Sequence, residues 1–308
     1  MPTVPEPIIP LCPPLENRFI NMNHIKKPIR HFWIGFFLLG LLQGCYPDYS
    51  PSIEKVIVLN ANDNELFTYD LINSKKEILL DTGLGFPWRL TLDAAQENVF
   101  WTNVDKNLVQ SLSLKTRDVT QHAIVTYPQG IALDEATGTI YIAEAGTPQI
   151  LQLKKNKAID TLAITGLSDP DNLIWDSKIK NLFWIDLGLH AVYQSKDRIR
   201  SIPLTTPDIY HPTALAYDRD QQQLYFYDQL SNEIHVLSIK SKQIHTLVKA
   251  PGKISSLKYL AEEDALYLLD ITQGAILRFG LKNRSFEVIY SDPSLQFHAD
   301  MGLILLKE

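Results

Sequence analysis

Residues 181–186 read "NLFWID", and five other segments of the chain follow the same pattern. Each is six residues long, rich in aromatic or β-branched side chains, and ends in Asp, Asn or Glu. The terminal residues follow one another at intervals of 41 to 43 positions and are Asn60, Asn103, Glu144, Asp186, Asp228 and Asp270. This composition predicts strands. A period near 42 residues is the length of one four-stranded propeller blade.

A second element precedes four of these segments. It places a proline six residues before an aspartate, and the aspartates are Asp93, Asp134, Asp176 and Asp218. Proline is tolerated at the start of a strand, and the aspartate can open a short turn into the next strand. Alternating runs such as "EIHVLSI" and outer runs such as "IHTLV" supply a third and a fourth strand. The sequence therefore predicts an all-β fold, a six-bladed β-propeller of four-stranded blades over residues 53–308.

The first blade has only three strands of its own, and the chain ends on "MGLILLKE", residues 301–308. We expect this last apolar strand to pair into the first blade as its innermost strand. That pairing would close the ring and remove its open edges.

The repeat resembles the YWTD-type propeller repeat of low-density-lipoprotein receptors (class B) and, more loosely, the NHL repeat. The residues Phe183-Trp184-Ile185-Asp186 stand in the place of the name-giving motif, and the likeness covers residues 53–308. The sixth repeat departs from the pattern, since Ile254 replaces the proline and Leu260 the aspartate. Similar YWTD propellers act as binding modules, so the resemblance implies a binding function.

The N-terminal region has the features of a secretory signal. The apolar run Phe32–Leu42 spans 11 residues, whereas a membrane-spanning helix needs about 20, and basic residues precede it. Leu42-Gln43-Gly44-Cys45 resembles the bacterial lipobox, which implies that Cys45 carries a lipid. An ordinary signal peptide with a chance cysteine is the alternative.

This interpretation divides the region before the propeller into three parts. Residues 1–21 are a leader extension or a non-native gene start, residues 22–44 the lipoprotein signal peptide, and residues 45–52 the lipidated cysteine with its tether. Tyr46 stands where an aspartate would resemble the inner-membrane retention signal. We therefore expect a bacterial cell-envelope protein, anchored in the outer membrane and facing the periplasm.

Composition excludes several kinds of site. The chain has 29 Lys and Arg against 35 Asp and Glu, a formal charge of −6, and no basic patch is visible in the sequence, which argues against nucleic acid as a partner. Cys12 and Cys45 are the two cysteines, so the mature domain would hold no thiolate zinc site and no cysteine nucleophile. No sequence signature of a catalytic site is present, and no catalytic residue is assigned.

Function is expected on one face of the propeller, which we call the loop face. The loops before the proline and after the motif acid meet there, and loops on a rigid scaffold carry function. Exposed aromatic residues with an arginine are typical of interface hot spots. The candidate ligand-binding residues are Phe86, Trp88, Arg89, Tyr127, Asp171, Asn172, His190, Tyr210, His211, Phe297 and His298. The expected partner of this monomeric domain is an envelope protein or glycan, although these aromatic residues could instead merely fill the loops.

An enzyme is the alternative function. Six-bladed calcium-dependent lactonases and hydrolases, which this chain resembles in its repeat number, hold a divalent ion at the channel mouth through Glu, Asn and Asp oxygens, which suit a hard cation. The residues that could do so here are Asn103, Glu144, Asn172 and Asp228. Calcium is expected only under this alternative, and otherwise no cofactor. The competing interpretation is that the motif acids hydrogen-bond the backbone, and that Trp101, Trp175 and Trp184 pack between blades.

Overall fold

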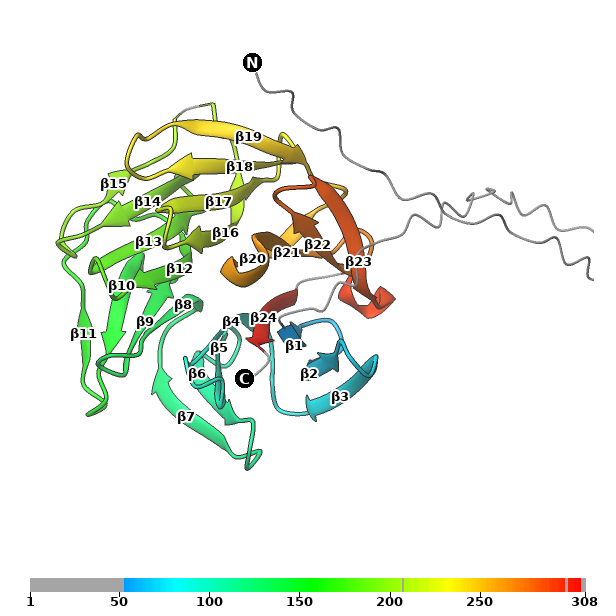
Figure 1. The fold of residues 1–308 in the computed structure, drawn as a ribbon. Coiled ribbons are helices and arrows are strands. Elements are labelled where there is room, and N and C mark those ends of the chain that lie inside the picture. Colours follow the sequence, from blue (N-terminus) through cyan, green and yellow to red (C-terminus); the bar gives the residue numbers. More distant parts are fainter. Residues whose placement is uncertain (1–52, 207, 297–298, 306–308) are drawn as a thin grey trace, which may run out of the picture. The chain divides into compact units, whose positions relative to one another are not determined.

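The computed structural model describes residues 53–206, 208–296 and 299–305, which form six four-stranded antiparallel sheets arranged around a common centre (Figure 1). We name the sheets blades A to F. From the inside outward, the strands of blades A to C are β24 (Ala299–Leu305), β1 (Ile53–Asn60), β2 (Glu65–Asp70) and β3 (Lys75–Leu80); β4 (Pro87–Leu92), β5 (Asn98–Asn103), β6 (Leu108–Ser113) and β7 (Val119–Ile124); and β8 (Pro128–Asp134), β9 (Thr139–Glu144), β10 (Gln149–Leu153) and β11 (Ile159–Thr161).

The strands of blades D to F are β12 (Pro170–Asp176), β13 (Asn181–Asp186), β14 (Ala191–Ser195) and β15 (Ile202–Pro203); β16 (Pro212–Asp218), β17 (Gln223–Asp228), β18 (Glu233–Ser238) and β19 (Ile244–Lys249); and β20 (Ile254–Leu260), β21 (Ala265–Asp270), β22 (Ala275–Gly280) and β23 (Ser285–Ser291). The predicted six-bladed, four-stranded architecture is confirmed.

The described residues contain two short 3-10 helices, η1 (Ala261–Glu263) and η2 (Pro293–Leu295). The first of them takes the place of the turn that an aspartate opens in blades B to E, and blade F has Leu260 at the position of that aspartate. Within this part of the chain, no helix is long and apolar enough to cross a membrane.

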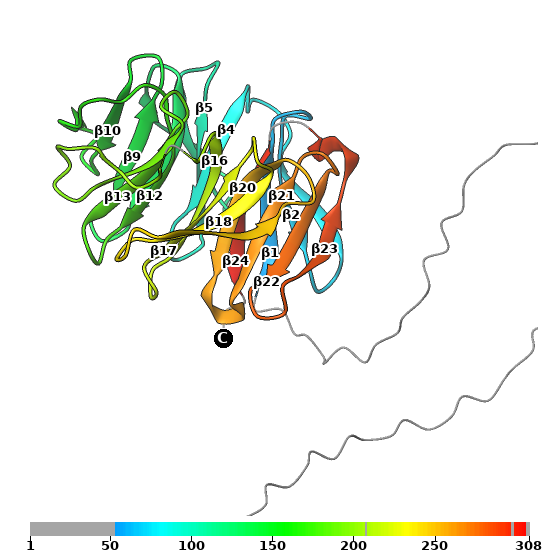
Figure 2. The same cartoon turned by 90° about the horizontal axis from the view of Figure 1, so that it is seen from above.

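The ring closes through the last strand of the chain. Strand β24 pairs antiparallel with β1, from Asn60 opposite Ala299 to Ile53 opposite Leu305. Figure 1 shows the red β24 beside the blue β1, and Figure 2 shows the same neighbours from a direction 90° away. The predicted closure of the first blade by the C-terminal strand is confirmed.

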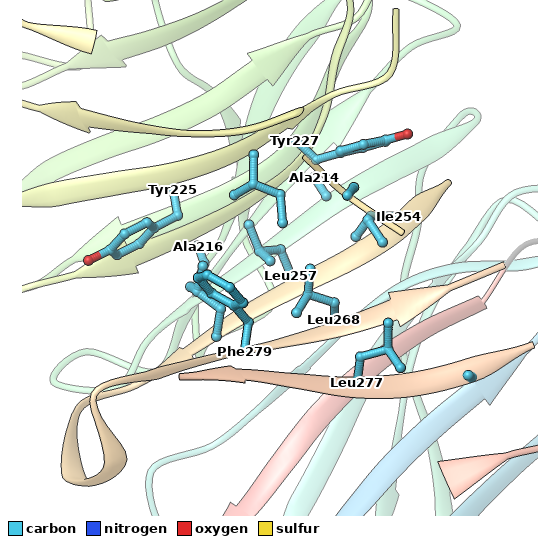
Figure 3. Close-up of a cluster of buried hydrophobic side chains, with 13 residues drawn as sticks. Ala214, Ala216, Tyr225, Tyr227, Ile254, Leu257, Leu268, Leu277 and Phe279 are labelled. Atoms are coloured by element: carbon cyan, nitrogen blue, oxygen red, sulfur yellow. The ribbon is translucent and has the colours of Figure 1, made fainter. Parts of the chain in front are cut away.

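Apolar clusters fill the spaces between neighbouring blades, one for each of the six interfaces. Between blades E and F, Tyr225 and Tyr227 of β17 lie in one cluster with Leu268 of β21 and Phe279 of β22 (Figure 3). Trp101 lies in the cluster between blades A and B, and Trp175 and Trp184 lie between blades C and D, as predicted. Burying side chains of this size contributes about 1.5–3 kcal/mol each, so the interfaces between blades hold the core.

A channel of about 340 Å³ runs between the six innermost strands. Arg89 of β4 crosses it at the end nearer the loop face. Its Nη2 lies 2.7 Å from Asp171 Oδ2, and its Nε lies 3.1 Å from Asp171 Oδ1. The same guanidinium donates to the carbonyl of Ser255 at 2.7 Å and to that of Thr213 at 3.3 Å. One side chain of blade B therefore contacts blades D, E and F.

The expected position of Arg89 in an exposed loop is wrong. Its exposed fraction is 6%, because the pairing of β4 with β5 shifts register between Pro87 and Leu90 and Arg89, one of the two skipped residues, borders the channel. Burial by itself would lower the pKa of Arg89, but attraction to Asp171 and Asp300 outweighs it and the pKa lies above its usual value. The guanidinium therefore stays charged.

Deleting residues 301–308 should abolish the cooperative unfolding of the whole domain. The deletion removes most of β24 and reopens both blade A and the cluster that contains Met301. Thermal melting followed by circular dichroism measures this. A truncated chain that melts like the full chain would contradict closure by β24.

Replacing Arg89 by Met should cost about 3–5 kcal/mol, since it leaves the Asp171 carboxylate buried and unpaired. For a domain of this size that is a fall in Tm on the order of 10 °C. The matched control is Arg117→Met, which breaks an exposed pair with Glu77 and should cost about 1 kcal/mol at most. An equal fall in Tm in the two variants would show that the Arg89–Asp171 pair contributes no more to stability than an exposed ion pair.

Candidate functional site

The loop face is formed as the sequence predicts, by the start of each inner strand and the end of its neighbour. Proline and motif residue lie directly opposite each other in blades B to E: Pro87 with Asn103, Pro128 with Glu144, Pro170 with Asp186 and Pro212 with Asp228. The loop that enters a blade and the turn that follows its second strand are therefore neighbours on one face.

The motif acids join these two segments. In blade E the carboxylate of Asp228 accepts hydrogen bonds from the backbone N–H groups of Tyr210 (3.1 Å) and His211 (3.0 Å) in the entering loop. It also accepts from the N–H of Leu230, at 3.0 Å, in the following turn. A buried carboxylate needs such donors, and here they fix the positions of Tyr210 and Leu230 relative to each other.

The arrangement recurs fully in blade D and in part in blade C. Asp186 accepts from the N–H groups of Ser168, Asp169 and Leu189, and Glu144 accepts from the N–H of Thr126. The interpretation of the motif acids as acceptors of backbone hydrogen bonds is therefore confirmed.

A patch of apolar and aromatic side chains, exposed except for the half-buried His211, lies on the loop face over blades D and E. We call it the loop-face patch, and its members are Leu189, His190, Tyr210, His211 and Leu230. The exposed fractions of Leu189, Tyr210 and Leu230 are 43%, 54% and 71%. The imidazole rings of His190 and His211 lie 5.1 Å apart between centroids, which links the two blades. The backbone that carries these side chains is held by the hydrogen bonds to Asp186 and Asp228, and the apolar side chains remain exposed to solvent.

Sequence reasoning missed two members of the patch, Leu189 and Leu230. Each lies in the turn after a motif acid, where blade B has Asp105 and blade F has Gln273. A leucine in a turn that the other repeats fill with polar residues was the available signal.

The other predicted loop-face residues lie apart from this patch or are buried. Phe86 and Trp88 pack together at 5.9 Å over blade B, both half-buried, and Tyr127 is exposed over blade C. Asp171 is fully buried against Arg89, and Asn172 donates to the carbonyl of Thr213 at 2.8 Å. Phe297 and His298 lie outside the described residues.

The four candidate metal ligands are each engaged in hydrogen bonds. Asn103 donates to the carbonyl of Leu84, and the partners of Glu144, Asn172 and Asp228 are given above. Among the residues that the structure describes, no group of three or more His, Cys, Asp or Glu side chains is placed to hold a metal ion.

Two carboxylates near the channel have shifted pKa values. Burial raises the pKa of Asp169, and the nearby Asp171 and Asp186 carboxylates raise it further. Burial would also raise that of Asp300, but attraction to Lys258 and Arg89 outweighs it and the pKa lies below its usual range. At this end of the channel, the carboxylates of Asp171 and Asp300 therefore face the cations Arg89 and Lys258, which belong to other blades.

No family model matches the sequence. The vitellogenin receptor of Solenopsis invicta is 22% identical over 287 residues, which cover 84% of this chain and 16% of the receptor. The vitellogenin receptor Yl of Drosophila melanogaster is 22% identical over 179 residues, covering 52% of this chain and 8% of that receptor. This chain therefore spans only a small part of the length of these relatives.

Solved structures of other proteins share the fold. A chain of the nidogen/laminin complex superposes with a TM-score of 0.71 at 19% identity, covering 81% of this chain and 98% of that one. A streptogramin B lyase superposes with a TM-score of 0.59 at 12% identity, covering 79% and 89%. The 42-residue repeat, the six blades and these likenesses show that the chain folds as a YWTD-like six-bladed β-propeller.

Proposed function

We propose that the protein is a lipid-anchored binding module of the bacterial cell envelope whose loop face grips a protein or glycan. The observation that carries this proposal is the loop-face patch, in which buried motif acids fix the backbone that carries exposed leucine, tyrosine and histidine side chains. Interfaces depend on a few large side chains that are fixed before binding. The patch has this character.

The similar proteins support a binding role. One superposed chain comes from a complex of nidogen with laminin, and the relatives in sequence are vitellogenin receptors. A propeller fold by itself serves many functions. The proposal therefore rests on the loop-face patch, and the similar proteins support only the general idea of a binding role. No nucleic acid partner is proposed, and the domain is proposed to act as a monomer.

The proposed anchor is a lipid on Cys45, which lies outside the described residues. The lipobox-like "LQGC" supports it, as does the basic and apolar segment before it. An acylated cysteine with two or three chains anchors a protein stably. Tyr46 after this cysteine favours the outer membrane, facing the periplasm.

The streptogramin B lyase shares only the fold, and no observation on this chain favours a lyase or a calcium-dependent hydrolase over a binding module. The carboxylates of Glu144 and Asp228 already accept backbone hydrogen bonds that hold loops. We therefore propose a function without a metal cofactor.

Replacing Tyr210 and Leu230 together by Ala should weaken partner capture at least tenfold, because truncating a hot-spot side chain costs about 2 kcal/mol or more. Capture from envelope extracts on immobilised protein, quantified by mass spectrometry, measures this. The matched control replaces Ile124 and Val288, equally exposed on the outer strands β7 and β23, and should leave capture unchanged. Capture that survives the first pair of substitutions would remove the patch from the binding site.

The melting temperature of the full chain in detergent should be the same with calcium and with chelator. A divalent ion at 100 times its Kd would stabilise a folded protein by about 2.7 kcal/mol, which is a shift of roughly 5–10 °C. A shift of that size would overturn the proposal of a metal-free module and direct attention to lactone and ester substrates.

A further inference from the structure

The face opposite the loop face, which we call the turn face, is cationic at its rim. It carries the turns that join the third to the fourth strand of each blade. In five blades the turn residue with positive φ is basic: Arg117, Lys157, Arg198, Lys242 and Arg284, with φ between 54° and 67°. All five are exposed. In a chain of net charge −6, this repetition concentrates positive charge at one rim.

The full turns of these five blades show the same concentration of positive charge. Residues 114–118, 154–158, 196–201, 239–243 and 281–284 contain 12 of the 29 Lys and Arg residues but only two acids, Asp118 and Asp197. The expectation that the chain has no basic patch is therefore wrong. The cations lie about 42 residues apart in sequence and come together only when the ring forms.

The turns between first and second strands also lie on this face and carry acids. Asp134, Asp176 and Asp218 are buried there, and the exposed acids are Glu97, Glu135, Asp220 and Glu262. Blade D is the exception, since its turn exposes Lys178 and Lys180 beside the buried Asp176. The positive charge is thus least compensated near blade D.

A groove of about 740 Å³ lies between blades C and D at this place. Five cationic residues line it, Lys154, Lys155, Lys180, Lys196 and Arg198, with the acids Asp134 and Asp197. Lys154 pairs with Asp160, and Asp197 pairs with Arg200. In the described part of the chain, no ion pair engages Lys155, Lys180 or Lys196.

The propeller is connected to its N-terminal segment on the same face. Strand β1 ends at the loop face with the motif residue Asn60, so Ile53, opposite Leu305, lies at the turn-face end. Cys45 precedes Ile53 by eight residues, which can span at most roughly 30 Å when fully extended. A lipid on Cys45 would therefore keep the turn-face end of β1, in blade A, within that distance of a bilayer.

We propose that the turn face, through the groove between blades C and D, binds the anionic phosphate headgroups of the membrane in which the protein is anchored. The inference rests on the proposed anchor, which decides that a bilayer is near. Each Lys or Arg close to an anionic bilayer strengthens association about fivefold, so a polybasic groove supplies a second attachment beside the acyl chains. Headgroup binding holds the loop face away from the membrane, open to its partner.

The test uses the full chain with Cys45→Ala, which lacks the anchor, and vesicles of phosphatidylcholine with or without 30% phosphatidylglycerol. We expect flotation to give tighter binding to the anionic vesicles and to lose that difference in 1 M salt. Replacing Lys155, Lys180 and Lys196 by Gln should weaken binding to anionic vesicles about 100-fold. The matched control replaces Lys106, Lys249 and Lys253, exposed residues that lie towards the loop face, by Gln and should change little.

Equal binding to neutral and anionic vesicles would overturn the proposal, and so would equal weakening in the two triple variants. Retention on heparin without charge-dependent vesicle binding would assign the groove to a soluble polyanion and also overturn it. Melting curves establish that both variants fold. The anchor is tested separately. If Cys45 carries a lipid, the unsubstituted chain should bind neutral vesicles more tightly than the Cys45→Ala chain, whether or not the groove binds headgroups.

Discussion

The structure depends on a guanidinium that crosses the centre of the ring. In a propeller, each innermost strand has a free edge whose backbone groups need partners. Thr213 and Ser255 are the residues that the register skips at the bulges of β16 and β20, and Arg89 donates to both of their carbonyls. Its charge is balanced by Asp171 of a third blade. Blades that the repeat joins only to their neighbours are thereby connected across the channel.

The repeat predicts the architecture because each blade solves the same packing problem. Aromatic and β-branched strands at a fixed period specify six similar sheets, and the unpaired apolar segment at the end of the chain specifies how the ring closes. A period does not predict where a strand bulges. Arg89 follows a proline that opens a strand, and only the register shift after Pro87 distinguishes a channel residue from a loop residue. Such a shift depends on neighbouring blades, which the local sequence does not describe.

The candidate site was predictable in position but only partly in its residues. The topology of the repeat places entering loops and motif acids on one face, and it correctly brings Tyr210, His211 and His190 there. Asp171 was assigned to that face as a candidate ligand-binding residue, whereas it is buried and pairs with Arg89. Leu189 and Leu230 were missed because they are departures from the repeat. The features that the blades share build the scaffold. The departures from the repeat, Leu189 and Leu230, make the loop face apolar over blades D and E.

The two faces differ because their turns have different structural roles. On the loop face, a buried motif acid accepts hydrogen bonds from the backbone of two segments, the entering loop and the following turn. These bonds fix the backbone of both segments, so their apolar side chains stay exposed and the loops do not fold over them. On the turn face, the turns between the third and fourth strands are short, and their left-handed residues are exposed. Lysine and arginine keep exposed turns soluble and protect neighbouring outer strand edges from pairing with other chains. Repeating that local solution around the ring gives a rim of positive charge, so the electrostatic asymmetry of the domain follows from the same periodicity that builds its core.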